Sequence, residues 1–423
     1  MTVREVNPRR ADLLITGANV VTPKGDAGVR GSVMGKLVEL PKASIAIYQG
    51  SIAAIGTTAQ VEEAFPSEIA LRRLDAVGLL VTPALVDCHT HPIWAGSRAH
   101  EFARRLAGAT YQEIMAEGGG IASTVLATRA ASDAELELLL KKRLDRMHSY
   151  GTGALEAKTG YGLSVDEELR HLRILDKTKQ ESSSPIFITC LGAHALPPEY
   201  TDNPDRYIDL VVNELLPAAA DYSDFVDVFC DEGAFTLQQA ERVLAAGKAL
   251  GLGLRIHADE FASLGAVGLA VEMAALSADH LHSSKPQDIK TLARSDTVAV
   301  LLPATSFFLR ERVFAPARAF LDADAIVAIA SDFNPGSANC PALQSSLIHA
   351  ALGLSMTPAE ILTATTLNAA AALDIANELG SLEQGKSADI ALWDVPDLTE
   401  LIQNWGVNHL QHLILGGKIH SSN

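Results

Sequence analysis

Cysteine is scarce in this sequence, and its four cysteines are scattered: Cys88, Cys190, Cys230 and Cys340. No two of them form a C-x-x-C pair. This usage argues against a disulfide framework and favours small core residues of a protein that we expect to be cytoplasmic. The chain also lacks an apolar stretch approaching the roughly 18 residues of a membrane span. Its start, MTVREVNPRR, contains no apolar signal core.

Positive charge is the second shortage. The sequence has 34 Lys and Arg against 51 Asp and Glu, which gives a formal net charge of -17. Nucleic acids and anionic membranes are bound through basic surfaces, so the composition argues against both as partners. A small anionic substrate is still compatible with this charge, because local arginines decide its binding.

The length of the chain and its pattern of apolar and helical segments predict one large domain and one small domain. At 423 residues the chain is too long for one ordinary core. After about residue 80, eight apolar segments alternate with mostly helical sequence, which is typical of an α/β fold of the (β/α)₈ TIM-like barrel type. These segments are 79–91, 153–162, 185–194, 225–233, 253–260, 276–281, 298–305 and 326–336.

Both ends of the chain contain short strand-like segments instead. We therefore expect a small β-sandwich domain formed from residues 1–78 plus 378–423, and a barrel over residues 79–377. Two helices are predicted from their capping residues. One begins after Ser132, and the other begins after Thr357 and runs towards residue 375. The long, glycine-rich segment 93–131 suits a loop that covers a substrate.

Polar residues gather where the predicted barrel strands end, which is where barrel enzymes place their chemistry. His89 and His91 end the first strand, and their spacing of two points both imidazoles to the same side. Alone, each such residue is usually a bonded core residue or part of a turn. Together they are hard to explain as structure, because buried imidazoles need partners. The other strand-end residues are His194, His257, Glu260, His280 and Asp332.

Three imidazoles and one carboxylate with an open position are typical of a catalytic zinc or iron site. Such an ion lowers the pKa of its water towards roughly 7 and makes hydroxide available. A second metal in barrels of this type is often held by a modified lysine at the end of the fourth strand. Here that strand ends in Cys230, Asp231 and Glu232, and Lys158 falls on the second strand, so we predict a single metal.

The order of these motifs resembles the metal-dependent amidohydrolase superfamily and, more closely, its imidazolonepropionase family. The resemblance rests on DCHTHPIWAGSRAHEFARRLAGATYQEI, KTGYGL, GAHALPPEY, CDEGAFT, HADEF, LLPATSFFLRE and SDFNPGSA. It covers most of residues 80–345. It implies hydrolysis of the ring amide C–N bond of 4-imidazolone-5-propanoate to N-formimidoyl-L-glutamate in histidine degradation. It also implies a homodimer. Ala84 is a small departure, because the superfamily often has glycine before its first metal motif.

The resemblance implies a role for each matching residue. Glu260 would shuttle a proton to or from the ring nitrogen, while His280 and Asp332 would orient the attacking water and help deprotonate it to hydroxide. His280 could instead only orient water. His194 would act in both catalysis and binding. One divalent metal per subunit, Zn²⁺ or Fe²⁺/³⁺, would be bound by His89, His91, His257 and Asp332. The substrate would contact Arg98, Tyr111, Tyr161, His194, Glu260, Asn334, Gly336 and Ser337.

Two other functions fit the same pattern. A deaminase of a heterocyclic base would use the same histidines and carboxylates. Arg98 separates the two readings, because a propionate needs a cation and a neutral base does not; Arg98 could also be a surface ion pair. Tyr111 could be a packing residue at a helix start. A scaffold protein that has kept the barrel is the third reading, although such relatives usually lose metal ligands and this chain has all four.

Overall fold

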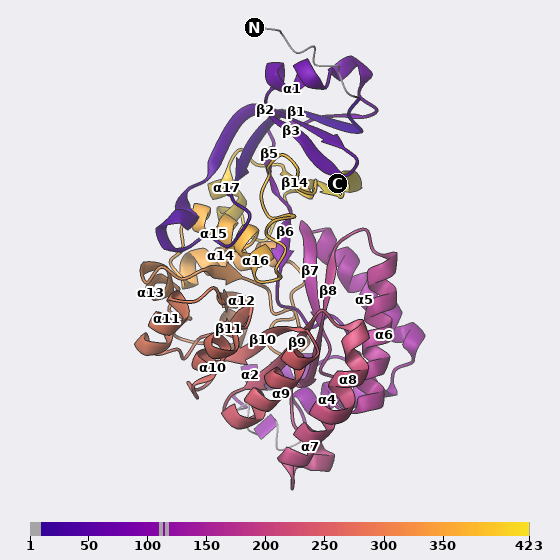
Figure 1. Cartoon of the computed structure of the whole chain (residues 1–423), viewed down its shortest axis with the longest axis vertical. Helices are drawn as coiled ribbons and strands as arrows, with labels where there is room; N and C mark the ends of the chain where they lie inside the picture. Colours follow the sequence, from indigo (N-terminus) through magenta and orange to yellow (C-terminus); the bar gives the residue numbers. More distant parts are fainter. Residues whose placement is uncertain (1–9, 110–112, 115–117, 423) are drawn as a thin grey trace.

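The computed structural model of the chain describes residues 10–109, 113–114 and 118–422. They form a barrel domain and a sheet stacked on one end of it (Figure 1). The prediction of a barrel with a small β domain from both termini is confirmed. All four cysteines are free thiols. Among the described residues, we find no helix with the length and apolar character that a membrane crossing needs.

The barrel contains eight parallel strands in chain order, each hydrogen-bonded to the next. A parallel bridge between Thr90 and Phe333, just beyond the first and last strands, brings the two edges together. All eight predicted segments contain one of these strands. They are β6 (Leu85–Asp87), β7 (Thr152–Lys158), β8 (Ile186–Ala193), β9 (Phe225–Cys230), β10 (Gly253–Ala258), β11 (Ser277–His280), β12 (Val298–Leu301) and β13 (Val327–Ile329).

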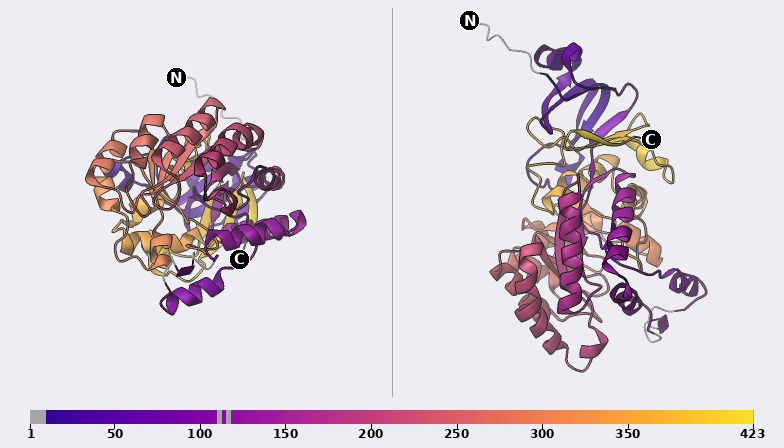
Figure 2. Two further views of the ribbon diagram at one scale, coloured as in Figure 1. Left: turned by 90° about the horizontal axis from the view of Figure 1, so that it is seen from below. Right: turned by 90° about the vertical axis from the view of Figure 1, so that its right-hand side faces the viewer.

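Helices surround these strands, as the view from below shows (Figure 2). Those after β6 to β8 are α2 (Ala99–Leu106), α4 (Ile121–Ala130), α5 (Asp133–His148), α6 (Val165–Glu181), α7 (Pro204–Leu210) and α8 (Leu216–Ala219). Those after β9 to β13 are α9 (Leu237–Ala249), α10 (Ala266–Met273), α11 (Pro286–Ala293), α12 (Pro303–Leu309), α13 (Ala317–Asp322) and α14 (Leu343–Gly353). The described part of the segment expected to be a covering loop therefore includes helices α2 and α4, which project from the barrel (Figure 2).

Helix α5 begins as predicted, with the Ser132 hydroxyl accepting a hydrogen bond from the backbone of Glu135. The single helix predicted after Thr357 is wrong. The chain forms α15 (Pro358–Ala364) and α16 (Leu367–Ala371), with a break at Thr365 and Thr366. Both threonine hydroxyls donate to carbonyls four residues earlier, at 2.8 and 2.6 Å, a pattern that bends helices.

The terminal domain is one mixed sheet in the order β16-β15-β14-β5-β1-β2-β3, with β4 beside β1. Where we expected a sandwich, all eight strands are hydrogen-bonded into this single sheet. β5 lies just beyond residue 78 and pairs with β1 on one side and β14 on the other, which joins the two termini. The strands are β1 (Leu13–Thr22), β2 (Val38–Tyr48), β3 (Ser51–Thr57), β4 (Arg73–Asp75), β5 (Leu80–Pro83), β14 (Ile390–Trp393), β15 (Leu410–Leu415) and β16 (Lys418–Ser422). Helices α1 (Thr58–Ala64) and α17 (Leu398–Gln403) belong to the same terminal segments.

Candidate metal centre and active site

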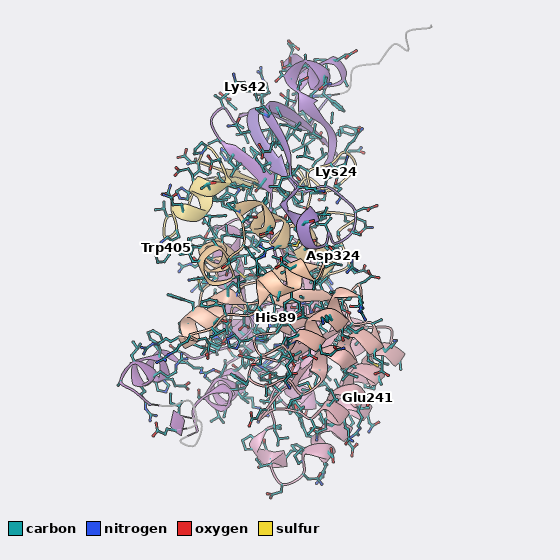
Figure 3. The ribbon with its side chains drawn as sticks, turned by 90° about the vertical axis from the view of Figure 1, so that its left-hand side faces the viewer. Lys24, Lys42, His89, Glu241, Asp324 and Trp405 are labelled. Atoms are coloured by element: carbon teal, nitrogen blue, oxygen red, sulfur yellow. The ribbon has the colours of Figure 1, made fainter. Side chains whose placement is uncertain are left out.

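The predicted site residues from six barrel strands meet around one cavity of about 980 Å³. Figure 3 labels His89 within the barrel domain, away from Lys24 and Lys42 of the terminal sheet. His89 is fully buried. The cavity wall includes His91, His194, His257, Glu260, His280 and Asp332.

His89 and His91 follow β6, and their Nε2 atoms lie 3.3 Å apart. Oδ1 of Asp332 lies 3.5 Å from each of these nitrogens. The other carboxylate oxygen, Oδ2, accepts a hydrogen bond from the Thr305 hydroxyl at 2.7 Å, which leaves Oδ1 facing the imidazoles. Two groups could hold a metal with ligand atoms within 4.8 Å: His89, His257 and His280, and His89, His91 and Asp332.

Two further carboxylates fix the orientation of the histidines from behind. Asp279 lies 2.6 Å from Nδ1 of His89, and Asp227 lies 3.1 Å from Nδ1 of His257. A proton on each Nδ1 leaves Nε2 free as a lone-pair donor, the usual arrangement behind a metal-binding histidine. Nε2 of His257 is buried without a hydrogen-bond partner among the described residues. These side chains therefore fit a divalent metal ion.

Burial keeps these imidazoles neutral, which is the form that binds metal. It lowers the pKa of His89 and of His91 well below the ordinary value, with help from Lys158 and neighbouring histidines. Burial also lowers the pKa of His194 and of His280 to about 3. The backbone at His280 and at Asp332 has positive φ values of 77° and 51°, so both site residues adopt a conformation that non-glycine residues rarely use.

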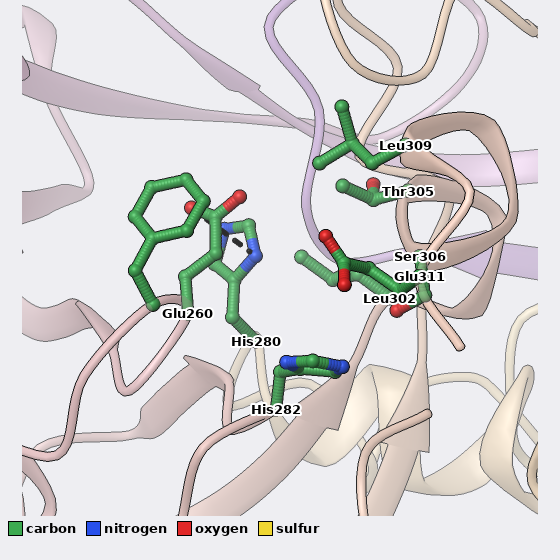
Figure 4. A pocket seen from close by; sticks show the side chains of 9 residues that line it. Glu260, His280, His282, Leu302, Thr305, Ser306, Leu309 and Glu311 are labelled. Atoms are coloured by element: carbon green, nitrogen blue, oxygen red, sulfur yellow. Dashed lines mark ion pairs between the residues drawn. The ribbon is translucent and has the colours of Figure 1, made fainter. Parts of the chain in front are cut away.

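Glu260 faces His280 across the cavity, with Oε2 at 3.6 Å from Nδ1 (Figure 4). Burial raises the pKa of Glu260 well above its ordinary value, and the negative charges of Asp332, Asp231 and Glu311 raise it further. Both shifts favour the uncharged forms, a protonated carboxyl on Glu260 and a neutral imidazole on His280. The turn that carries Glu260 is held by Asp231, which accepts three backbone N–H bonds from residues 260–262 at 2.6–3.0 Å.

Arg98 lines the opposite part of the cavity wall and is only 12% exposed. Its Nε donates to Glu101 at 2.8 Å. The other oxygen of Glu101 accepts hydrogen bonds from the Gly120 backbone at 3.0 Å and the Ser123 hydroxyl at 2.9 Å. The guanidinium is thereby held by one edge, and Glu101 ties α2 to the start of α4.

The remaining predicted substrate contacts also lie in the cavity wall, except Tyr111, which is outside the described residues. His194 is hydrogen-bonded through Nδ1 to the Gly160 carbonyl at 2.9 Å and stacks on His91 with ring centroids 5.1 Å apart. The ring of Tyr161 lies 5.4 Å from that of His194. Asn334 uses its side-chain amide to hold its own turn. Its oxygen accepts the N–H groups of Gly336 and Ser337, each at 2.8 Å.

Sequence reasoning missed Asp227, Asp279 and Asp231. The first two occupy strand interiors that were assigned to the core, and a buried carboxylate at an inward position is a signal that it needs a cationic or N–H partner. Lys158 lies on the second barrel strand as predicted. It is fully buried between Glu156 and Asp227, at 2.7 Å from each. The single metal stays a prediction.

Comparison with known proteins agrees with this geometry. The family model described as "Amidohydrolase family" matches residues 237–420. A protein of Herpetosiphon aurantiacus named imidazolonepropionase is 42% identical over 418 residues, 97% of both chains. One of Geobacillus sp. (strain WCH70) with the same name is 43% identical over 389 residues, 91% of this chain and 92% of its own.

Among solved structures, an adenosine deaminase from Xanthomonas campestris with bound zinc matches with a TM-score of 0.74 and 19% identity, over 97% of this chain and 93% of its own. At that identity the match supports the fold alone. The sequence relatives are similar over nearly their whole length, and we conclude that this chain belongs to the imidazolonepropionase family of the amidohydrolases.

Proposed function

We propose that this protein hydrolyses the ring amide of 4-imidazolone-5-propanoate to N-formimidoyl-L-glutamate, a step of histidine degradation. Full-length relatives that carry the name imidazolonepropionase support this activity. The observation that carries it is Arg98, whose side chain is largely covered and lines the same cavity as the histidine cluster. A guanidinium held by one edge has N–H groups left to bind a carboxylate, here the propionate of the substrate.

His89, His91, His257 and Asp332 would hold one divalent ion, which we propose to be zinc or iron. When bound, such an ion polarises the substrate carbonyl and lowers the pKa of a water molecule towards roughly 7. Asp279 and Asp227 keep Nε2 of His89 and His257 directed at this position. Thr305 does the same for Asp332 by occupying its second oxygen.

The chain's own residues would then divide the binding and proton transfers. Arg98 binds the propionate, and Tyr161 and His194 position the ring. His280 and Asp332 orient the attacking water and hold the proton that it loses. Glu260 would be the proton donor, because burial and nearby carboxylates raise its pKa and so favour its protonated form. It donates a proton to the ring nitrogen as the C–N bond breaks, and the ring opens so that the carbonyl carbon, with the oxygen from water, becomes a new carboxylate of the same molecule.

The deaminase alternative has less support. A deaminase releases ammonia from a neutral base, which does not need an arginine in the cavity to bind it. The structural match to an adenosine deaminase is 19% identical and supports only the shared barrel.

The test is to supply freshly prepared 4-imidazolone-5-propanoate to the purified protein and follow the loss of its ultraviolet absorbance. The His257→Ala variant is the control, because it removes one proposed metal ligand. We expect rapid decay with the wild type and the spontaneous rate with the variant. Equal decay in both, together with ammonia release from a purine or pyrimidine, would establish the deaminase instead.

A further inference from the structure

A chain of buried charged side chains lies behind the metal centre. Its five members are fully buried and come from four of the barrel strands, β7, β9, β10 and β11: Glu156, Lys158, Asp227, Arg255 and Asp279. The mechanism above uses only the two aspartates. Three are carboxylates and two are cations. Barrel interiors are normally filled with branched apolar side chains, so five charged residues packed together in one are unusual.

The contacts link two of the proposed metal ligands without a gap. Starting from His257, Asp227 is 3.1 Å from its Nδ1 and Lys158 is 2.7 Å from Asp227. Lys158 is also 2.7 Å from Glu156, and Nε of Arg255 is 2.9 Å from the same Glu156 oxygen.

The second half of the chain ends at the other histidine. Nη2 of Arg255 lies 3.1 Å from Oδ2 of Asp279, and that same oxygen lies 2.6 Å from Nδ1 of His89. Lys158 approaches it as well, at 3.9 Å. Arg255 is anchored in turn by the carbonyls of Ala372 and Cys88, at 2.6 and 2.7 Å.

Strand alternation explains why these residues meet. Glu156 and Lys158 are two apart on β7, and Arg255 and His257 are two apart on β10, so each pair points to the barrel interior. Lys158 keeps its charge there. Burial alone would lower its pKa, but Asp227 and Glu156 raise that pKa above its ordinary value.

Stability alone is a poor explanation of this network. Buried ion pairs are often no better for stability than apolar side chains of the same volume, because desolvation of the ions offsets their attraction. The network does have a geometric effect. Both oxygens of Asp227 lie 3.1 Å from Nδ1 of His257, and one of them also accepts from Lys158, whereas Oδ1 of Asp279 has no hydrogen-bond partner among the described residues. Without Arg255, little would keep Oδ2 of Asp279 turned towards His89.

We propose that Lys158 and Arg255 are positioning residues of the metal centre. They hold Asp227 and Asp279 in the orientation that directs Nε2 of His257 and His89 at the ion, and they thereby set the affinity for the metal. The inference rests on the metal site of the proposed function. Loss of a partner behind a metal-binding histidine commonly weakens metal affinity by roughly 10- to 100-fold.

The experiment measures binding of Co²⁺ to the metal-free protein, by competition with a chromophoric chelator and by the visible absorption spectrum. Lys158→Met keeps the length of the side chain and removes its charge. Arg255→Lys keeps the charge but cannot reach Glu156 and Asp279 together. We expect the dissociation constant for Co²⁺ to rise roughly 10- to 100-fold in both variants, with an altered spectrum that reports displaced ligands.

Lys386→Met is the matched control for the loss of a buried lysine. Lys386 is also buried, but it lies in the segment after α16 and donates to the carbonyls of Gly25 and Ala376, each at 2.5 Å. This variant should lose thermal stability while its Co²⁺ affinity and spectrum match the wild type. A purely structural role of Lys158 would give that same result for Lys158→Met.

The outcomes separate the two proposals. A wild-type protein that fails to bind Co²⁺ contradicts the metal site of the proposed function. A wild type that binds, together with folded variants of the same affinity and spectrum, overturns the positioning role. Circular dichroism establishes folding, and if Lys158→Met does not fold, Arg255→Lys decides the question alone.

Discussion

A Cβ atom built on Gly336 would lie 1.9 Å from Nη1 of Arg98 and 2.5 Å from its Cζ. The guanidinium therefore occupies the space that any side chain at position 336 would need. Gly336 is among the residues expected to contact the substrate, but its N–H already donates to the Asn334 side chain. What this glycine provides is room for the arginine proposed to bind the propionate.

Gly336→Ala should displace Arg98 and weaken substrate binding. A hydrogen bond to a charged group contributes about 1.5–3 kcal/mol, which corresponds to a roughly 10- to 150-fold rise in KM. We expect kcat to change far less, because the metal centre is untouched. Steady-state kinetics with 4-imidazolone-5-propanoate measures both. Gly268→Ala in α10 is the control, since a Cβ there meets no atom within 4 Å. An unchanged KM in Gly336→Ala would show that the guanidinium has another low-energy position.

The second prediction concerns Glu101, which accepts hydrogen bonds from Nε of Arg98, from the Gly120 backbone and from the Ser123 hydroxyl. Glu101→Gln keeps the shape but loses the negative charge, so the arginine should become less well ordered. We expect KM to rise several-fold, by less than in Gly336→Ala, with kcat nearly constant. Glu199→Gln is the matched control. It removes the charge from an exposed pair with Arg129, outside the cavity wall, and exposed pairs contribute little. Equal KM values in the two variants would contradict the prediction.

Glu260 should act on the chemical step. Glu260→Gln cannot donate the proton that the departing ring nitrogen needs, and loss of a general acid typically lowers kcat by roughly 10²- to 10⁴-fold. Binding of Co²⁺ should be unchanged, because Glu260 is not among the proposed ligands. Kinetics and metal titration on the same preparation test this. Loss of metal binding together with activity would instead make Glu260 part of the metal centre.

The barrel and the strand-end residues could be predicted because both follow from local pattern. Eight apolar segments separated by helices specify the strands, and residues just beyond a strand must lie at its carboxyl end. The network behind the histidines could not be predicted in the same way. Asp227, Arg255 and Asp279 sit inside strands, and their partners depend on which strands become neighbours when the barrel closes.

Long-range packing explains the other differences. The fit of Gly336 to Arg98 joins the turn after β13 to the start of α2, and no local pattern in either segment specifies it. The break between α15 and α16 goes with the burial of two threonines whose hydroxyls donate to backbone carbonyls four residues earlier. The local helix propensity of this segment favours one continuous helix, but packing against the rest of the domain interrupts it.

His171 on α6 gives a prediction about stability rather than activity. Its side chain is fully buried, and neither ring nitrogen has a hydrogen-bond partner among the described residues. Burial lowers the pKa of His171 to about 3, and the positive charges of Arg170 and Arg129 contribute to that shift. A pKa near 6.5 is expected in the unfolded chain. Between pH 6.5 and 3, His171 is protonated in the unfolded state but neutral in the folded state. The folded state therefore loses stability as the pH falls towards 3.

His171→Leu should remove this acid sensitivity. At pH 5 the unfavourable contribution of His171 amounts to roughly 2 kcal/mol, whereas at pH 7.5 it is close to zero. The free energy of unfolding, measured by urea denaturation of the metal-free proteins, should therefore favour the variant by about 2 kcal/mol more at pH 5 than at pH 7.5. The histidines of the metal centre titrate in both proteins and cancel in this difference. His100→Leu, at an exposed position on α2, should show no such pH-dependent gain. Parallel stability curves for the wild type and His171→Leu would mean that His171 is solvated or hydrogen-bonded in solution.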